Sequence, residues 1–317
     1  MQHPLHRRLA LIDMGTNTFH LLIVQLPEEP RTEPLVLLRT KVGVKLGEGG
    51  ISQGEIAPAA FARALHTLQA FQEEIELHQV PEVRATATSA VRVARNGPEL
   101  VQTIFEQTGI RVEVIAGERE AELIAKGVRQ AVPLGNEVNL VVDVGGGSVE
   151  FIIADEATIF WKQSFEIGAQ RLLDMFFPDP SGIMPAAAVA AEQAHLRVVL
   201  DSLVAAVQHY RPVGLVGASG SFDSLADMQL GRLRPEAELP PCTELALSSF
   251  QSSYRHLLSG NHEQRLAIPG ILPMRADMLV VSAVLIDFVL GITGITRLRT
   301  SAYALKEGLL AEMMEAS

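Results

Sequence analysis

The sequence predicts an α/β protein built from a duplicated domain, and three observations support this. Apolar, β-branched runs alternate with amphipathic helical segments along the 317 residues. Residues 139–154 have the pattern of an apolar strand, a glycine-rich turn and a second apolar strand, and residues 8–26 repeat that plan. The aspartates that end the two first strands lie 130 positions apart (143 − 13), a domain-sized separation. Each half is therefore expected to give one such turn to a shared cleft, where small ligands commonly bind.

Composition and charge narrow the class of protein. The formal net charge of −11 argues against nonspecific binding to nucleic acid or to an acidic membrane surface. Cys242 is the only cysteine, so no disulfide forms within the chain, which fits a reducing cytoplasm. The apolar run 9–12 is too short for a signal peptide. Residues 278–295 are the most apolar window, but Ser282 and Asp287 interrupt it, which favours a buried helix over a membrane span.

The second hairpin predicts a metal–phosphate site. With Gly146 and Gly147 at the tip of a two-residue turn, where positive φ costs glycine little, Asp143 lies opposite Glu150. Opposed side chains share one face of the sheet with Cβ atoms about 5 Å apart, and two carboxylates placed so repel. Magnesium suits the pair, because it takes one or two protein carboxylates and adds water and phosphate oxygens. The N–H groups of 145–148 would hold an anion; the alternative is a glycine turn with a solvated glutamate.

The first hairpin follows the same plan with different side chains. The same pairing places Asp13 opposite His20, which we interpret as a packed histidine rather than a catalyst. Lys41 and Lys45 follow on the next strand. They face either the cleft or solvent, and the sequence does not decide between the two.

Periodicity and turn signals predict the other elements in chain order. Strands are expected at residues 35–45, 83–88, 110–115, 158–165, 214–217 and 295–300. Helices are expected at residues 55–79, 98–108, 167–177, 184–208, 222–228, 245–258, 261–266, 274–290 and 303–314, and one more from about residue 118. Residues 217–221 form a third glycine/serine turn, where a strand runs into a helix whose positive end favours an anion.

Two segments carry further candidate residues. Arg92 and Arg95 lie one helical turn apart, and the spacing suits a phosphate clamp as well as a surface pair. Glu118, Glu120 and Glu122 open a helix, where acidic residues are favoured by the helix dipole without any catalytic role. A carboxylate at such a helix start also stays ionised near neutral pH, as a general base must.

Five segments together resemble, in order, the motifs of the Ppx/GppA phosphatases, which are exopolyphosphatases and guanosine pentaphosphate phosphohydrolases. The segments are residues 13–18, 87–92, 115–121, 142–150 and 217–220. The resemblance implies the actin-like fold of sugar kinases and heat-shock chaperone ATPases, with two ribonuclease H-like domains flanking a cleft. It implies one domain at 1–122, with the C-terminal helix 302–317 packing back on it, and a second at 123–301. It also places the catalytic carboxylate on Glu120 and the metal carboxylates on Asp143 and Glu150.

The chain departs from the family pattern in three places. The first turn is Gly-Thr-Asn-Thr instead of Gly-Ser-Asn-Ser, which keeps the hydroxyl groups. Arg119 replaces the first glutamate of a Glu-Glu pair, so the assignment of Glu120 depends on one carboxylate. Residues 301–308 differ from the family's Ser-Asp-x-Gly-Leu-Arg-Glu-Gly, which leaves the role of that segment open.

These features predict a hydrolase that releases the terminal phosphate of polyphosphate or guanosine pentaphosphate. Glu120 would activate water, and Mg²⁺ on Asp143 and Glu150 would neutralise phosphate charge. The phosphate-binding candidates are Asp13, Gly15, Thr16, Asn17, Thr18, Arg92, Gly145, Gly146, Gly147, Ser148, Ser219, Gly220 and Ser221, with Arg265 and Arg275 as weaker ones. The alternatives are a small-molecule kinase of the same superfamily and a catalytically weak nucleotide or polyphosphate sensor. A cytoplasmic location without nucleic-acid or membrane partners is expected, and a homodimer is left open.

Overall fold

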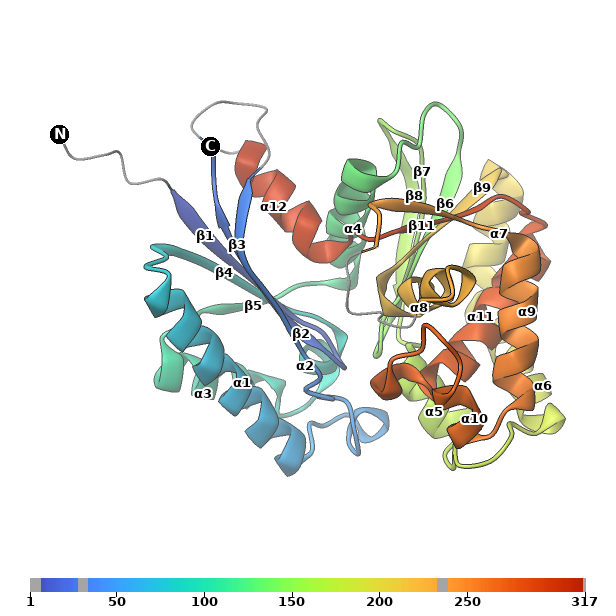
Figure 1. Ribbon diagram of the computed structural model, residues 1–317, viewed down its shortest axis with the longest axis horizontal. Helices are drawn as coiled ribbons and strands as arrows, with labels where there is room; N and C mark the ends of the chain where they lie inside the picture. The colour runs from blue at the N-terminus through green and yellow to red at the C-terminus, as the bar shows by residue number, and fades with distance from the viewer. Residues whose placement is uncertain (1–6, 28–33, 233–238, 316–317) are drawn as a thin grey trace. The chain divides into compact units, whose positions relative to one another are not determined.

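The chain folds into two compact α/β units in a computed structural model that describes residues 7–27, 34–232 and 239–315 (Figure 1). Unit 1 comprises Met1–Ala116 and Leu309–Ser317, and unit 2 comprises Gly117–Gly308. The sequence prediction placed the first boundary after residue 122, inside helix α4 (Gly117–Ala131). The structure keeps α4 whole within unit 2, because the helix packs along strands of that unit.

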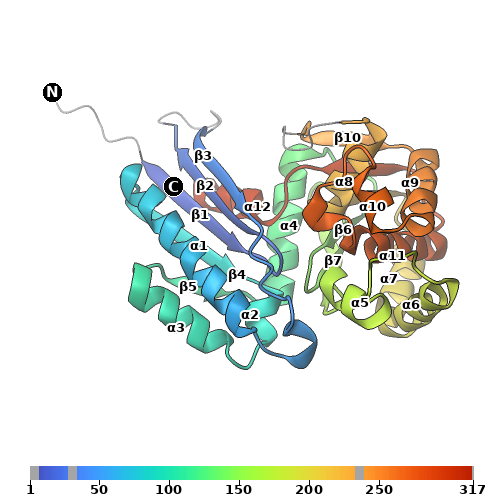
Figure 2. The same cartoon turned by 60° about the horizontal axis from the view of Figure 1, so that its bottom comes forward.

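Unit 1 is a five-stranded mixed sheet with helices on both faces. Its strands are β1 (Arg8–Met14), β2 (Phe19–Gln25), β3 (Leu35–Val42), β4 (Glu82–Ala87) and β5 (Val112–Val114), in the order β3-β2-β1-β4-β5. The first three are antiparallel, and β4 and β5 run parallel to β1. Helices α1 (Pro58–Leu77) and α3 (Gly97–Thr108) cover one face (Figure 2), with the short η1 (Ile51–Gln53) and α2 (Ser89–Val93) at its edge.

The strands of unit 1 alternate in the face to which they point their side chains, as a period of two requires. Ala10 and Ile12 pack toward α1 and α3. Leu9 and Leu11 point to the opposite face, where Leu309 and other apolar residues of the last helix, α12 (Leu305–Glu315), complete a separate cluster. The C-terminal helix thus covers the face of the sheet that α1 and α3 leave open.

Unit 2 repeats the same strand order, which confirms the predicted α/β duplication. Its strands are β6 (Asn139–Val144), β7 (Val149–Ala154), β8 (Ile159–Phe165), β9 (Gly214–Ala218), β10 (Cys242–Leu245) and β11 (Leu298–Ser301). The order β8-β7-β6-β9-β11 matches β3-β2-β1-β4-β5, with β10 added antiparallel at the edge. In both units the first three strands form an antiparallel meander and the fourth runs parallel to the first, the ribonuclease H-like arrangement.

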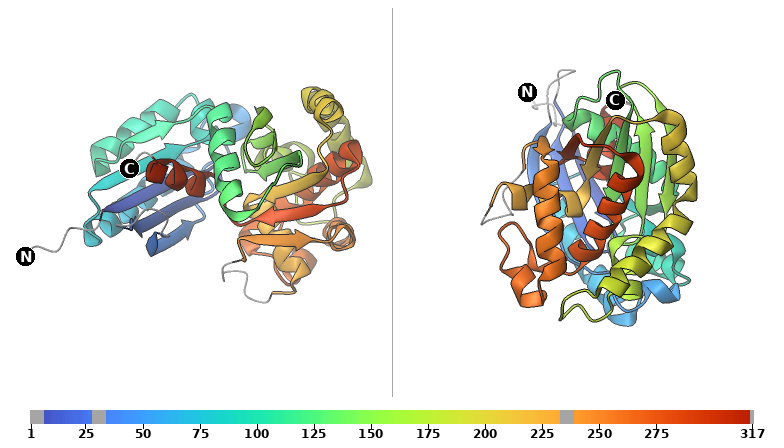
Figure 3. Two further views of the ribbon diagram at one scale, coloured as in Figure 1. Left: turned by 90° about the horizontal axis from the view of Figure 1, so that it is seen from above. Right: turned by 90° about the vertical axis from the view of Figure 1, so that its right-hand side faces the viewer.

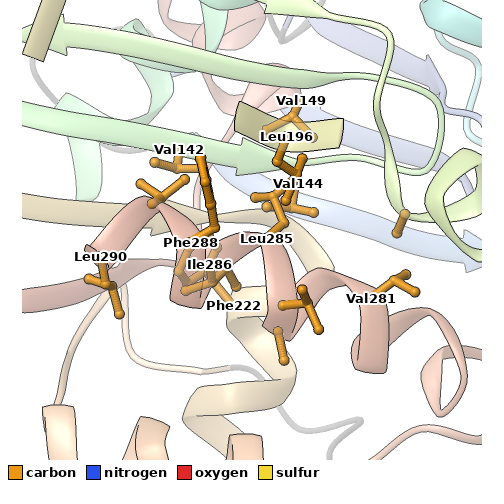
Figure 4. Packing of buried hydrophobic residues seen from close by; sticks show 14 of the residues in the cluster. Val142, Val144, Val149, Leu196, Phe222, Val281, Leu285, Ile286, Phe288 and Leu290 are labelled. Atoms are coloured by element: carbon orange, nitrogen blue, oxygen red, sulfur yellow. The ribbon is translucent and has the colours of Figure 1, made fainter. Parts of the chain in front are cut away.

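The main core of unit 2 lies between one face of this sheet and a layer of helices (Figure 3). The helices are α5 (Ala169–Phe176), α6 (Ala186–Val199), α7 (Asp201–Tyr210), α8 (Ser219–Gln229), α9 (Leu247–Ser259), α10 (His262–Leu266) and α11 (Met278–Thr293), with η2 (Pro273–Arg275) before the last. Helix α11 is buried along most of its length, and its Leu285 and Phe288 pack near Val142 and Val144 (Figure 4). Alternation of the strand side chains sends Asp143 and Glu150 to the other face, where α4 packs against β7 and β8.

Two helix predictions needed correction. The expected helix 184–208 is two helices, α6 and α7, that meet at Leu200. Leu196, Leu200 and Leu203 are all buried on both sides of the junction. The helix expected from residue 274 begins at Met278, because Pro273–Arg275 forms a 3₁₀ turn. No helix of the described chain is long and apolar enough to cross a membrane.

Candidate functional site

The β6–β7 hairpin has the predicted register. Asp143 pairs with Glu150 and Val144 with Val149, and the N–H of Gly145 donates to the carbonyl of Ser148 at 3.1 Å. The predicted turn geometry was wrong, because neither Gly146 nor Gly147 is among the glycines with positive φ. The conformation of the turn is instead fixed by a helix that begins about twenty residues later.

The start of α5 binds the carbonyl groups of this turn. Three backbone hydrogen bonds do so: Gly168 N to Gly147 O (3.0 Å), Ala169 N to Gly145 O (2.9 Å) and Gln170 N to Gly146 O (2.8 Å). No peptide bond of the described chain is cis, and in a trans peptide the C=O and N–H groups point in opposite directions. The N–H groups of Gly146, Gly147 and Ser148 therefore point away from α5. Consecutive N–H groups arranged in this way form an anion-binding concavity.

Three carboxylates gather beside the turn and are almost fully buried. Glu120 is 7% exposed, Asp143 5% and Glu150 1%. Burial raises the pKa of Glu150 well above its ordinary value, and the negative charges of Glu120 and Asp143 raise this pKa further. Hydrogen bonds from Ser164 and Ser148 oppose that rise, and the Ser164 hydroxyl donates to Glu150 Oε1 at 2.7 Å. Burial and the two neighbouring carboxylates thus disfavour the ionised form of Glu150.

The third predicted turn, residues 217–221, provides a hydrogen bond to Asp143. Burial raises its pKa to about 6, while a hydrogen bond from the Ser219 side chain and the positive charge of Lys306 act in the opposite direction. Ser219 is the first residue of α8, directly after β9, and has φ of +66°, a left-handed conformation that is uncommon for a residue other than glycine. This strained turn lies beside Asp143 because the preceding residue, Ala218, pairs with Asp143 in the sheet.

The first turn of α4 distinguishes Glu120 from its acidic neighbours. Glu118 is exposed, whereas Glu120 is buried in the carboxylate cluster. Glu122 forms ion pairs with Lys162 (2.9 Å) and Arg119 (3.3 Å), and these contacts lower the pKa of Glu122. Arg119 thus pairs within its own helix, with the same glutamate that binds Lys162 of β8. Among the three glutamates, Glu120 is the one within electrostatic reach of Glu150.

The donor set suits a hard cation. Asp143 and Glu150 supply carboxylate oxygens from paired positions on neighbouring strands. Burial raises the pKa of both groups. Within the described residues, no group of three or more His, Cys, Asp or Glu side chains is arranged to hold a metal ion. A two-carboxylate site fits magnesium, which keeps several waters and binds substrate phosphates. Magnesium at this pair remains our proposal.

Three further phosphate candidates, Ser221, Arg275 and Arg265, already make contacts within unit 2. The Ser221 hydroxyl donates to Ser282 in the core at 3.0 Å, so its side-chain hydrogen is already used. Arg275 lies against Gly220 and donates to the carbonyl of Gly220 at 2.6 Å, at the edge of the turn. Arg265 was wrongly considered a phosphate ligand: it is fully buried, donates to Asp277 and to the carbonyl of Pro180, and holds α10 in place.

The other predicted phosphate ligands lie in unit 1. Asp13 pairs with His20 as predicted, and Gly15 N donates to Thr18 O at 3.1 Å, which closes the first turn as Gly145 and Ser148 close the second. Thr16 and Asn17 form its tip. Arg92 donates to the carbonyl of Ile115 at 3.1 Å, within the same unit. Their role in phosphate binding stays a prediction.

Four residues near the site of unit 2 were missed by the sequence reasoning: Ser164, Lys162, Arg171 and Lys306. Ser164 could have been found by extending the strand pairing to β8, since it pairs with Glu150. Lys306 stands where the family pattern has arginine, lies 2.9 Å from Glu307 and lowers the pKa of Asp143. The altered segment 301–308 therefore keeps a cation near the carboxylates.

Fold and site together define a duplicated α/β protein with a buried carboxylate cluster beside a glycine-rich, anion-binding turn. The family follows from comparison with known proteins: residues 28–317 match the model of the Ppx/GppA phosphatase family, and the chain belongs to this family. The resemblance noted in the sequence is thus confirmed.

Three relatives illustrate the similarity. The crystal structure of an exopolyphosphatase from Cytophaga hutchinsonii is 42% identical, with a TM-score of 0.92 and 98% of both chains covered. The Aquifex aeolicus member of the Ppx/GppA family shares the fold at 22% identity and a TM-score of 0.79, over 98% of this chain and 99% of that one. A guanosine-5'-triphosphate,3'-diphosphate pyrophosphatase of Photobacterium profundum is 29% identical over 99% of this chain, which spans 60% of that protein's length.

Proposed function

We propose that this chain is a phosphohydrolase that releases the terminal phosphate of inorganic polyphosphate or guanosine pentaphosphate. The observation that carries the proposal is the burial of Glu120 in one cluster with Asp143 and Glu150, beside a turn whose N–H groups point away from α5. The Cytophaga relative is named an exopolyphosphatase and the Photobacterium relative a guanosine-5'-triphosphate,3'-diphosphate pyrophosphatase, which supports the two substrate classes.

In the proposed reaction, a water oxygen attacks the terminal phosphorus and the bond to the bridging oxygen breaks. Glu120 accepts the proton of the water, and the products are orthophosphate and a chain shorter by one phosphate. The N–H groups of Gly146, Gly147 and Ser148 hold the phosphate oxygens in line for attack. Magnesium bound by Asp143 and Glu150 would add positive charge against those oxygens. Chemistry of this kind depends mostly on positioning and electrostatic stabilisation.

The first turn, Gly15–Thr18, is proposed to bind phosphate through the same kind of backbone N–H donors, since its closing hydrogen bond is the same. Arg119, which departs from the family pattern, had favoured the alternative of a catalytically weak sensor. Arg119 pairs with Glu122 and replaces none of the three acids of the cluster, which weakens that alternative.

Measuring orthophosphate release tests the proposal. Purified protein is given tripolyphosphate, long polyphosphate and guanosine pentaphosphate, each with Mg²⁺ and with EDTA. We expect Mg²⁺-dependent release from at least one of them. The absence of release from all three, in protein shown to be folded, would favour the sensor, and ATP-dependent phosphorylation of a sugar or of acetate would favour the kinase.

Chain length sharpens the substrate class. With a net charge of −11, the protein repels polyanions at long range, so capture depends on local cations. We propose that the site binds only the last few phosphates, and that kcat/KM per chain end is flat or falls with length. A steady rise in kcat/KM beyond about ten phosphates would instead show an extended binding track, because a chain of that length extends further than a Debye length.

A further inference from the structure

The start of α5 packs against the β6–β7 turn so closely that one position excludes any side chain. A Cβ on Gly168 would overlap the backbone of Gly146 and Gly147. Gly168 has φ of −61°, so conformational freedom is not the reason for glycine here. The requirement is steric, because α5 must come near enough for three of its N–H groups to reach the turn.

Arg171 adds a fourth donor to the same carbonyls. Its Nε donates to Gly147 O at 2.9 Å, and its guanidinium also pairs with Glu166 at 3.2 Å. The side chain is only 16% exposed, so the contact is well shielded from solvent. Gly147 O accordingly accepts hydrogen bonds from both Gly168 and Arg171.

We infer that Gly168 and Arg171 are positioning residues, which set the direction of the phosphate-binding N–H groups by holding the turn carbonyls from behind. They act through the peptide planes of Gly145–Ser148 and do not themselves touch the substrate. The inference rests on the proposed function, because it assigns these residues to phosphate binding by that turn.

Unit 1 contains an independent version of this arrangement. Lys45 N donates to Asn17 O at 2.8 Å and Gly47 N to Thr16 O at 3.0 Å, from the segment that follows β3. In unit 2 the equivalent carbonyls of Gly147 and Gly146 accept from residues 168 and 170, which follow β8 with the same spacing of two. The two segments differ in sequence and conformation, yet they hold the same two carbonyls. This agreement points to a requirement of the turn rather than to incidental packing.

Arg63 reinforces the unit 1 version as Arg171 does in unit 2. Its Nε donates to Val44 O at 2.7 Å and its Nη2 to Lys45 O at 3.0 Å. In unit 2 the arginine binds the turn itself, whereas in unit 1 it binds the segment that holds the turn. A guanidinium thus supports the turn in both units, directly in unit 2 and through residues 44 and 45 in unit 1.

The first test is Gly168→Ala, with Gly182→Ala as the matched control. No atom of the described part of the chain lies within 4 Å of a Cβ on Gly182. The added methyl at 168 must push the turn away from α5, and a misplacement of about 1 Å can cost about 10²-fold in rate. We expect a loss of that order in kcat/KM for tripolyphosphate, and none for the control. Unchanged kcat/KM in Gly168→Ala would overturn the inference.

The second test covers the case in which Gly168→Ala does not fold. Arg171→Lys keeps the charge but cannot reproduce the Nε hydrogen bond, and Arg197→Lys is the control, since Arg197 is exposed on α6. Backbone amide NMR signals of Gly146, Gly147 and Ser148 are followed while tripolyphosphate is added without Mg²⁺. In Arg171→Lys we expect altered starting shifts for these three amides and about tenfold weaker binding, as is typical for loss of an outer supporting contact.

The proposed function and the positioning role fail separately. If the wild type releases no phosphate and its turn amides do not respond to tripolyphosphate, the proposed function fails. If the wild type is active and its amides respond, but Arg171→Lys matches the wild type in both shifts and affinity, only the positioning role is overturned.

Discussion

The β1–β2 and β6–β7 hairpins have the same backbone pairing. They differ in the row of side chains that lie side by side across the strands. In unit 2 the row runs Asp143, Glu150 and Ser164 across β6, β7 and β8. In unit 1 the equivalent row runs Asp13, His20 and Lys41 across β1, β2 and β3. One row contains two acids and a hydroxyl, and the other contains one acid followed by two basic side chains.

This difference shows how a duplicated scaffold divides its roles. The register fixes where the three side chains lie, and their identity decides the local charge. The unit 1 row sets two basic side chains beside its single carboxylate. The unit 2 row contains no basic side chain, and burial raises the pKa of both its acids. We therefore propose an external cation for the unit 2 row alone.

The largest effect is expected from Glu120, which lies on α4 and belongs to neither row. Glu120→Gln keeps the shape of the side chain but cannot accept a proton, and loss of a general base typically costs about 10²–10⁴-fold in rate. Glu122→Gln is the control, because Glu122 is committed to Lys162 and Arg119. Single-turnover phosphate release measures both. Near-wild-type turnover in Glu120→Gln would move the base to another group.

The next effect compares the two rows directly. Glu150→Gln should raise the Mg²⁺ concentration for half-maximal activity by about 10–100-fold, the range seen when metal-supporting groups are lost. Asp143→Asn should act in the same direction. His20→Asn, at the matching position of unit 1, should leave the Mg²⁺ curve in place. Mg²⁺ titrations of activity decide this, and equal shifts in both units would remove the distinction drawn between the rows.

Glu192 is a buried acid that lies outside both rows, and its ionisation is expected to affect stability without affecting magnesium dependence. Burial raises the pKa of Glu192 in α6 to about 9, and among the residues that the structure describes neither of its carboxylate oxygens has a hydrogen-bond partner. The unfolded chain releases this proton near the ordinary value of 4.5. Its contribution to stability is therefore complete below pH 4.5 and is lost as the pH rises toward 9, by about 1.4 kcal/mol per unit.

Glu192→Gln should accordingly raise the free energy of unfolding at pH 7.5, by a few kcal/mol at the ~1.4 kcal/mol per pH unit given above, and leave the Mg²⁺ curve unchanged. Its advantage should shrink as the pH falls toward 4.5. Urea unfolding at several pH values measures this, with Glu263→Gln on the surface of α10 as the control. An advantage that does not depend on pH would contradict the assignment of a neutral, buried Glu192.

The smallest effect concerns the segment that holds the unit 1 turn. Lys45 has φ of +50°, and its backbone is bound on both sides by Asn17 and Arg63. Lys45→Gly should relieve about 1 kcal/mol of left-handed strain and keep the hydrogen bond to Asn17. Unchanged kcat/KM with a slightly higher melting temperature is expected. A clear fall in affinity for tripolyphosphate would show that the Lys45 ammonium binds phosphate.

Local rules predicted the pairing in each hairpin but not the shape of the turn. Counting outward from two glycines gives Asp143 opposite Glu150, because the side-chain period of a strand is two. The φ angles of Gly146 and Gly147 could not be predicted in this way, since donors on α5 fix them. The break at Leu200 and the burial of Arg265 are likewise set by packing against distant elements, which no local pattern reports.

The motifs located the carboxylates, and the fold supplied their neighbours. Asp143 and Glu150 followed from the pairing across the hairpin and Glu120 from the family pattern, and the structure places all three in one cluster. Ser164 would have followed from extending the pairing to β8, whereas Arg171 became visible only with the start of α5. Each lies on an element whose exact position depends on tertiary contacts.

Unit 1 is assembled from two segments of the chain that unit 2 separates, so the ribosome makes them at different times. Strands β1 and β2 emerge before unit 2, whereas Leu309 and Met313, which cover Leu9 and Leu11, emerge after it. One apolar face of the nascent sheet therefore waits uncovered while the whole of unit 2 is made. Exposed apolar surface of this kind promotes aggregation. A ribosome stalled before α12 should present a substrate for chaperones, whereas synthesis of α12 allows the first domain to close.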